Sequence, residues 1–165
     1  MLSSKDVKTI ADAKQIVEER EISHIKVGIF DIDGIMRGKY MSKEKFFSSL
    51  DNGFAFCDVV LGWDSKDNLY DNVNFTGWHT GYPDAPVRVI PESCREIPFE
   101  DNTLLFIGEF TEKAAEICPR NLLKRVIARA RDMGFDPFAA VEYEFFMFKE
   151  SPESVREKGF KNLVP

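Results

Sequence analysis

The amino-acid sequence predicts an α+β fold, in which about the first 110 residues form a mixed sheet that grips a helix. Two observations lead to this prediction. Apolar residues recur at helical spacing near the N-terminus and again after Pro119, and the segments between them carry short β-branched and aromatic runs bounded by turn residues. We place one domain at residues 1–111, with its leading helix, and the start of a second domain at residues 112–165.

The first 41 residues predict a helix followed by a β-hairpin. Apolar side chains lie near helical spacing over residues 3–20. Residues 23–32 are rich in Ile, Val and Phe and predict a buried strand. The Asp33-Gly34 pair is typical of a turn, so we expect the chain to return as a strand over residues 35–41.

A second helix, irregular structure and two strands are predicted next. Ser42 is a good N-cap for a short helix over residues 43–50. Gly, Asn, Asp, Pro and aromatic residues then dominate and predict a long loop over residues 61–86, which in a compact domain is usually functional or interfacial. Apolar runs predict strands at residues 87–91 and 103–110.

Pro119 begins a clear amphipathic helix that Gly134 is suited to end. Its apolar stripe comprises Leu122, Leu123, Val126, Ile127, Ala130 and Met133. Residues 138–148 then predict a strong strand, and residues 149–165 are polar and predict little structure. Because a lone helix and strand cannot bury both their faces, we expect the chain to be a fragment of a larger protein.

Composition and charge exclude several classes of function. The 165-residue chain is 44% hydrophobic and has a net charge of −6, which argues against a nucleic-acid partner because such binding needs a basic face. No apolar run approaches the roughly 18 residues of a membrane span, so we expect no membrane partner. Cys57, Cys94 and Cys118 are widely spaced and predict reduced thiols in a cytoplasmic protein.

Two pairs of carboxylates could carry the chemistry. The first pair, Asp31 and Asp33, follows a strand in the sequence Asp-Ile-Asp-Gly, as the nucleophile loop of a haloacid-dehalogenase-type phosphatase does. That class also needs a later acidic pair for Mg²⁺, and no later strand of this sequence ends in one. In the alternative, both aspartates are turn residues of a hairpin.

The second pair, Glu142 and Glu144, lies on the predicted strand. Side chains two residues apart on a strand share a face, with Cα atoms roughly 6.5 to 7 Å apart. Two glutamates so placed can bind two hard divalent cations at neighbouring sites. The pair could instead belong to a solvated strand face, although Phe146 and Phe148 on the same face argue against this.

Three stretches of the sequence resemble the glutamine synthetase family. Residues 119–148, PRNLLKRVIARARDMGFDPFAAVEYEFFMF, resemble the start of its catalytic domain. Residues 31–46, DIDGIMRGKYMSKEKF, resemble its N-terminal β-grasp domain, and residues 79–93 resemble the segment that leads to the next strand. The resemblance covers the chain from about residue 15 onward and is nearest to the branch that includes γ-glutamyl-polyamine synthetases.

This resemblance implies an ATP-dependent ligase that joins ammonia or an amine to glutamate through γ-glutamyl phosphate. It implies that Glu142 and Glu144 each bind one of two Mg²⁺ or Mn²⁺ ions, Glu144 the ion nearer glutamate and Glu142 the ion that bridges the ATP phosphates. Asp31 and Asp33 would be structural residues of the β-grasp hairpin. The partners implied are glutamate, ammonia or an amine, ATP, and further copies of the chain in a homo-oligomer.

Asp64 is a further candidate that the resemblance supplies. It matches an Asp that in glutamine synthetases reaches a neighbouring subunit's active site and helps to bind ammonium. The family carries Gly at the next position, whereas this chain carries Ser65, a departure that fits another amine equally well. In the alternative, Asp64 is an ordinary turn residue of its loop.

The family's remaining metal ligands and its nucleotide-binding strands would lie beyond Pro165, so we expect the chain alone to be inactive. One alternative is a non-catalytic β-grasp module that mediates assembly through the aromatic residues between positions 54 and 82. The other alternative is the phosphatase.

Overall fold

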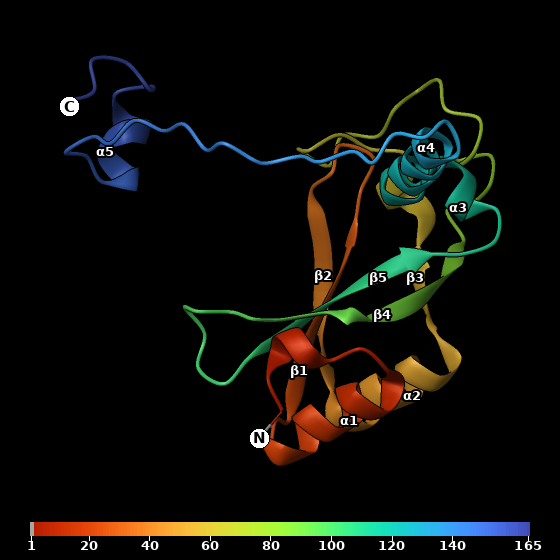
Figure 1. Cartoon of the computed structure of the whole chain (residues 1–165). Coiled ribbons are helices and arrows are strands. Elements are labelled where there is room, and N and C mark those ends of the chain that lie inside the picture. The colour runs from red at the N-terminus through yellow and green to blue at the C-terminus, as the bar shows by residue number, and fades with distance from the viewer. Residues whose placement is uncertain (1) are drawn as a thin grey trace.

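The computed structural model describes residues 2–165 and contains a curled five-stranded sheet of order β2-β1-β5-β4-β3 (Figure 1). The strands are β1 (His24–Phe30), β2 (Met36–Ser42), β3 (Phe54–Cys57), β4 (Asp84–Glu96) and β5 (Leu104–Phe110). The central pair, β1 and β5, is parallel, and every other pair is antiparallel. The predicted hairpin and the two later strands are therefore present.

Two helices cover the sheet and enclose the main core. Helices α1 (Ile10–Glu19) and α2 (Lys43–Asn52) lie together at the lower end of the sheet in Figure 1. Their inward side chains pack with alternate residues of the strands, and the Phe46 ring of α2 packs against the Phe106 ring of β5 at an interplanar angle of 47°, with ring centroids 4.7 Å apart. Burying these aromatic and aliphatic side chains is the main force that binds the helices to the sheet.

The first helix begins later than the sequence predicts. A 3₁₀ turn, η1 (Ser4–Asp6), precedes it, and α1 starts only after a capping box between Thr9 and Asp12. The Asp12 amide donates to the Thr9 hydroxyl at 3.1 Å, and the Thr9 amide donates to the Asp12 carboxylate at 2.8 Å. This reciprocal pair satisfies the free amides of the first turn and so fixes the start of the helix.

Two elements between residues 54 and 96 depart from the prediction. The short edge strand β3 has four residues and pairs only with β4. Strand β4 runs well beyond the predicted five residues, across a register shift between Ile90 and Arg95. After β3, the 3₁₀ turn η2 (Asp58–Leu61) leads into the long loop, which is anchored where the buried Thr76 hydroxyl donates to Asp58 at 2.5 Å.

In the C-terminal part, the prediction of a strand over residues 138–148 is wrong. Helices α3 (Ala114–Ile117), α4 (Pro119–Asp132) and α5 (Pro152–Glu157) are present, but residues 138–148 do not form a strand. Within the described residues no other strand pairs with this segment, so its backbone lacks the hydrogen-bonding neighbour that a strand requires. It forms an extended arm between α4 and α5 (Figure 1).

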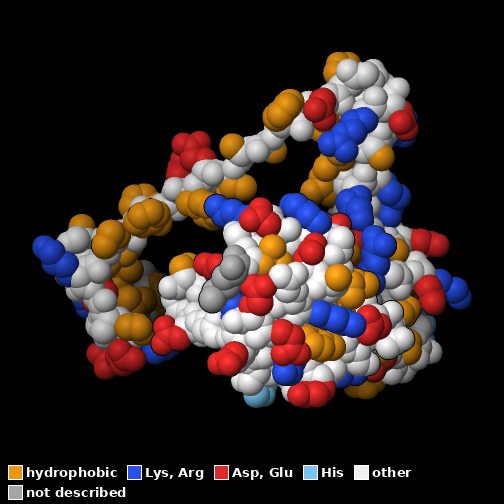
Figure 2. Space-filling view, turned by 60° about the horizontal axis from the view of Figure 1, so that its bottom comes forward, with side chains coloured by type: hydrophobic (Ala, Val, Ile, Leu, Met, Phe, Trp, Pro, Cys, Tyr) orange, Lys and Arg blue, Asp and Glu red, His pale blue; other side chains and the backbone are white. Residues whose placement is uncertain are grey.

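The arm and α4 leave much apolar surface uncovered. Phe138 is 91% exposed and Phe146 is 89% exposed, and in Figure 2 the thin arm carries hydrophobic side chains along its length. The apolar stripe of α4 is also open, because Leu122, Leu123 and Val126 are all more than half exposed. A separate observation is that none of the helices over residues 2–165 combines the length and the apolar character of a bilayer span.

Candidate functional site

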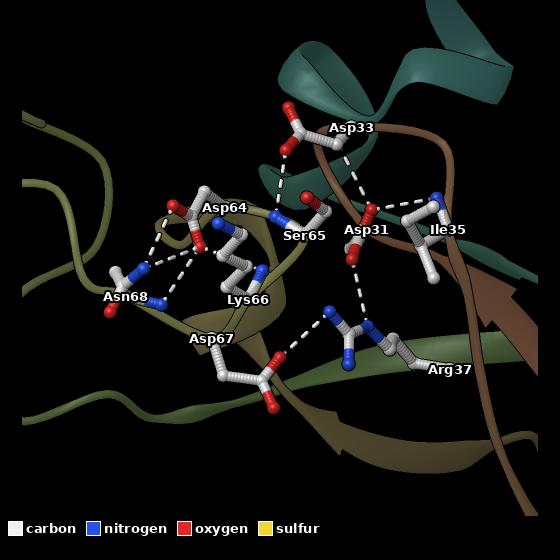
Figure 3. A network of polar contacts seen from close by, with 9 residues as sticks. All are labelled: Asp31, Asp33, Ile35, Arg37, Asp64, Ser65, Lys66, Asp67 and Asn68. Carbon is white, nitrogen blue, oxygen red and sulfur yellow. Dashed lines mark hydrogen bonds and ion pairs between the residues drawn. The ribbon is translucent and has the colours of Figure 1, made fainter. Parts of the chain in front are cut away.

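The β1–β2 turn contains the first carboxylate pair. Asp31 is fully buried, and its Oδ1 accepts hydrogen bonds from the backbone amides of Asp33 at 3.0 Å and Ile35 at 2.8 Å. Its Oδ2 accepts from Nε of Arg37 at 2.8 Å (Figure 3). A nucleophile needs an accessible oxygen with a free lone pair directed at the substrate, so this arrangement favours a structural role for Asp31.

Asp33 of the β1–β2 turn and Arg37 of β2 both contact a second loop. Asp33 is exposed, and its Oδ2 accepts from the backbone amide of Ser65 at 2.8 Å. Arg37 forms an ion pair with Asp67, with 2.7 Å between Nη2 and Oδ1. Figure 3 shows both contacts, one from the β1–β2 turn and one from β2, to the loop that carries Asp64.

Asp64 lies in a small turn and is half-buried. Its Oδ1 accepts from the amides of Lys66 at 2.8 Å and Asn68 at 2.9 Å, and its Oδ2 accepts from Nδ2 of Asn68 at 3.0 Å. The hydrogen bonds from the Asn68 side chain and backbone are the main cause that lowers the pKa of Asp64 below its ordinary value. Asp64 is therefore a carboxylate at neutral pH, the charge state that attracts an ammonium ion.

Glu142 and Glu144 lie on the exposed arm instead of on a strand. Over residues 2–165 neither side chain has a hydrogen-bond or ion-pair partner, and no contact joins them to Asp64. The structure therefore leaves both carboxylates accessible, but it does not bring the three predicted site residues together.

The described residues do not form a metal centre by themselves. Nowhere in residues 2–165 do three or more His, Cys, Asp or Glu side chains cluster in a way that could bind an ion. Hard divalent cations take about six oxygen ligands, so two isolated glutamates are too few. A metal site at Glu142 and Glu144 would need ligands from outside the described residues.

A buried carboxylate that the sequence analysis missed is Glu109 of β5. Its side chain is 2% exposed and is contacted by Arg88 at 3.0 Å, Arg120 at 2.8 Å and Lys124 at 3.0 Å. Burial acts to raise the pKa of Glu109, but the hydrogen bonds from the three basic side chains together outweigh it, and the pKa is lowered. The available signal was a glutamate inside an apolar strand, followed by basic residues four apart on a helix.

The aromatic residues of the long loop have separate surroundings. Trp63 lies beneath the guanidinium of Arg37, 5.1 Å from the ring centroid. Trp78 is 82% exposed and packs edge-on against Tyr82 with 5.3 Å between ring centroids. Nε2 of His79 lies 3.1 Å from the carbonyl oxygen of Asn74. The contacts of Trp78 and His79 are local packing within the loop, whereas Trp63 packs against β2 through Arg37.

Comparison with known proteins gives matches over nearly the whole chain. Residues 116–164 match the family model described as "Glutamine synthetase, catalytic domain". The chain is 46% identical over 144 residues to "Type-1 glutamine synthetase 2" of Dictyostelium discoideum, which covers 86% of the chain and 28% of that relative. It is 32% identical over 171 residues to "Glutamate--isopropylamine ligase" of Pseudomonas sp, which covers 99% of the chain and 37% of that relative. The chain thus spans well under half the length of either relative.

Solved structures show the same mixed α/β arrangement. The structures "GmaS/ADP complex-Conformation 1" and "Apo GmaS without ligand" each match with a TM-score of 0.55, at 19% and 20% identity. Each match covers 73% of this chain and 26% of the solved one, and at this identity it concerns the fold alone. From the family model and the two relatives we conclude that the chain belongs to the glutamine synthetase family.

Proposed function

We propose that the chain is the N-terminal part of an ATP-dependent ligase that joins ammonia or an amine to the γ-carboxyl group of glutamate. The match of residues 116–164 to the catalytic-domain model carries this proposal, because that segment contains Glu142 and Glu144. One relative is named as a glutamine synthetase and the other as a glutamate–isopropylamine ligase, which supports the same bond-forming reaction with either nitrogen source.

The proposed reaction has two steps. The γ-carboxylate of glutamate attacks the terminal phosphorus of ATP, which gives γ-glutamyl phosphate and ADP. The nitrogen of ammonia or the amine then attacks the acyl carbon, phosphate leaves with one former carboxylate oxygen, and the nitrogen loses a proton. Activation by phosphoryl transfer turns a poor leaving group into a good one.

Each predicted site residue has a place in this proposal. Glu142 and Glu144 contribute ligands to Mg²⁺ or Mn²⁺ ions whose other ligands lie outside the described residues, and the exposure of both carboxylates supports this. Asp64 contributes to amine binding, and its lowered pKa and half-buried carboxylate support this. Because the metal and nucleotide sites need further residues, we expect the chain alone to be inactive.

We infer that residues 1–111 form a β-grasp domain and that residues 112–165 begin the catalytic domain. The parallel β1–β5 pair at the centre of the mixed sheet and the packing of α2 against it support the first assignment. The uncovered stripe of α4 and the exposed arm support the second, since apolar surface of this kind is normally packed against more protein. We expect a cytoplasmic homo-oligomer.

The test is an assay of the full-length protein with ATP, glutamate and a panel of ammonium, methylamine, isopropylamine, ethanolamine and putrescine. We expect phosphate release that requires both glutamate and one of these nitrogen compounds. Glu142→Gln and Glu144→Gln should each lower turnover by about 100-fold, because each removes a charged metal ligand. Glu157→Gln, an exposed glutamate of α5, is the matched control and should retain turnover.

Two results would contradict the proposal. If phosphate release were absent with every nitrogen compound, the alternative of a non-catalytic assembly module would be favoured. If Glu142→Gln and Glu144→Gln behaved like Glu157→Gln, the two arm glutamates would have no part in the reaction.

A further inference from the structure

The loop that carries Asp64 is a tight turn with its own backbone hydrogen bonds. Trp63 and Leu69 form an isolated antiparallel bridge, and the amide of Asp64 donates to the carbonyl of Asn68 at 3.0 Å. The amide of Asp67 donates back to the carbonyl of Asp64 at 3.0 Å, and Asp67 has a φ of 64°. This left-handed residue closes the turn. We call residues 63–69 the Asp64 loop.

The contacts that link the Asp64 loop to the sheet come largely from the β1–β2 turn and from Arg37 at the start of β2. Asp33 accepts from the Ser65 amide at 2.8 Å, so it fixes the backbone directly after Asp64 (Figure 3). Arg37 forms an ion pair with Asp67 at the other end of the turn, and its guanidinium covers the Trp63 ring. The β1–β2 turn and the start of β2 therefore contact the Asp64 loop at three separate residues, Ser65, Asp67 and Trp63.

The β1–β2 turn and Arg37 are themselves held in place by Asp31. Asp31 is fully buried and binds both the backbone amides of the turn and Nε of Arg37, so the Arg37 side chain cannot swing away without leaving a buried charge unpaired. In addition, the backbone amide of Ile32 donates to the carbonyl of Val60 at 3.1 Å, just before the Asp64 loop begins. The position of Asp64 is thus set from the sheet through Asp31, Asp33 and Arg37.

The two oxygens of the Asp64 carboxylate have different hydrogen-bond partners within this loop. Its Oδ1 accepts from two backbone amides, whereas Oδ2 accepts only from the Asn68 side chain. A carboxylate oxygen has two lone pairs, so Oδ2 keeps acceptor capacity for an outside donor while Oδ1 fixes the loop.

We propose that Asp33 and Arg37 are positioning residues for amine binding, which fix the Asp64 loop so that Asp64 Oδ2 faces the nitrogen substrate. The inference rests on the proposed ligase function and on the role of Asp64 within it. Fixing the loop before substrate arrives lowers the entropy cost of binding a small cation, so loss of these contacts weakens amine binding selectively.

The test compares steady-state constants of variants of the full-length enzyme. Asp33→Ala should raise the KM for the amine about fivefold, while the KM values for ATP and glutamate stay within about twofold. Asp33→Asn keeps an oxygen that accepts from Ser65 and should restore the amine KM. Asp101→Ala, which removes an exposed aspartate from the turn between β4 and β5, is the matched control.

A double variant separates positioning from direct contact. If Asp33 acts through Asp64, the amine KM of Asp33→Ala combined with Asp64→Asn should equal that of Asp64→Asn alone. If the rise in the amine KM of the double variant equalled the product of the rises in the two single variants, the inference would be overturned. An unchanged amine KM in Asp33→Ala, or an equal rise in the KM values for amine, ATP and glutamate, would overturn it as well. An unchanged amine KM in Asp64→Asn would instead overturn the role of Asp64 in the proposed function.

Hydrogen exchange gives a readout that needs no turnover. Amides of the Asp64 loop should exchange faster in Asp33→Ala than in the parent protein or in Asp101→Ala. Unchanged exchange in this loop would overturn the inference, even if the parent ligase were active.

Discussion

Asp31 is the residue on which the β1–β2 turn depends. Its buried carboxylate satisfies two backbone amides and pairs with Arg37, which is itself only 21% exposed at its side chain. Buried carboxylates are tolerated when every oxygen has a partner, as it has at this position. The two aspartates of the Asp-Ile-Asp-Gly sequence thus have different structural tasks, one inside the turn and one on its surface.

Replacement of Asp31 should therefore be costly. Asp31→Ala would leave two amides and the Arg37 guanidinium without their acceptor, and we expect the free energy of unfolding to fall by about 3 kcal/mol. Urea denaturation of the 165-residue chain measures this. Asp101→Ala should change the same quantity by less than about 0.5 kcal/mol. Equal effects of the two substitutions would show that the Asp31 network does not stabilise the fold.

Turns and helix caps were predictable from the residues at these positions, whereas contacts between residues far apart in the sequence were not. The sequence predicts the turn at Asp33-Gly34 and the N-cap at Ser42, which accepts from the Lys45 amide at 3.3 Å. Both depend on neighbours in the chain. The pairing of Asp33 with Ser65 depends on how two distant turns meet, and no local pattern encodes it.

At the scale of elements, Glu109 joins three of them. It lies on β5, and its partners Arg88 on β4 and Arg120 and Lys124 on α4 surround it. The N-terminal half of α4 is therefore fixed to the sheet by charge as well as by packing. This bears on the proposed ligase function, because α4 leads directly into the arm that carries Glu142.

This cluster predicts a specific dependence of stability on pH. The pKa of Glu109 is lowered in the folded chain, so its contribution to stability is complete above the ordinary glutamate pKa and is lost as pH falls through the folded value. Glu109→Gln should lower the free energy of unfolding by about 2 kcal/mol at pH 7, with a difference from the parent that shrinks in acid. Urea denaturation between pH 7 and about pH 3 measures it.

Comparison with a second variant separates the contribution of Glu109 to the pH dependence of stability from the contributions of other carboxylates. Glu150, for example, has a pKa lowered to about 2, chiefly by its hydrogen bond with Lys158, and it titrates in both the parent and the variant. Glu157→Gln should give a curve parallel to that of the parent. If the free energy of unfolding of Glu109→Gln also ran parallel to that of the parent at every pH, the ionised Glu109 and its three basic partners would not contribute to stability.

Elements with strong local signals were predicted, and those that depend on distant partners were not. Helix α4 has a proline start and a regular apolar stripe, and it forms as predicted. Residues 138–148 have a strong strand composition but no neighbouring strand within the described residues, so the same side chains lie on an extended arm. Strand β3 was missed because it has only four residues, which show no alternation of polar and apolar side chains.

At the scale of the whole molecule, a well-packed sheet and an open C-terminal part coexist. The core side chains of the sheet and of α1 and α2 are almost fully buried, whereas the arm is exposed along its length (Figure 2). The candidate site is divided in the same way, with Asp64 on the packed body and the two glutamates on the arm. Sequence resemblance predicts these three residues as site residues, and over residues 2–165 no hydrogen bond or ion pair joins the two glutamates to Asp64.

The most direct test of the proposed ligase follows one oxygen atom. Full-length protein is supplied with ATP, the nitrogen compound that supports turnover, and glutamate labelled with ¹⁸O in its γ-carboxyl group, and the released phosphate is analysed by mass spectrometry. Passage through γ-glutamyl phosphate predicts that each phosphate carries one oxygen from glutamate. Phosphate released without label, at a rate independent of glutamate, would contradict the central claim.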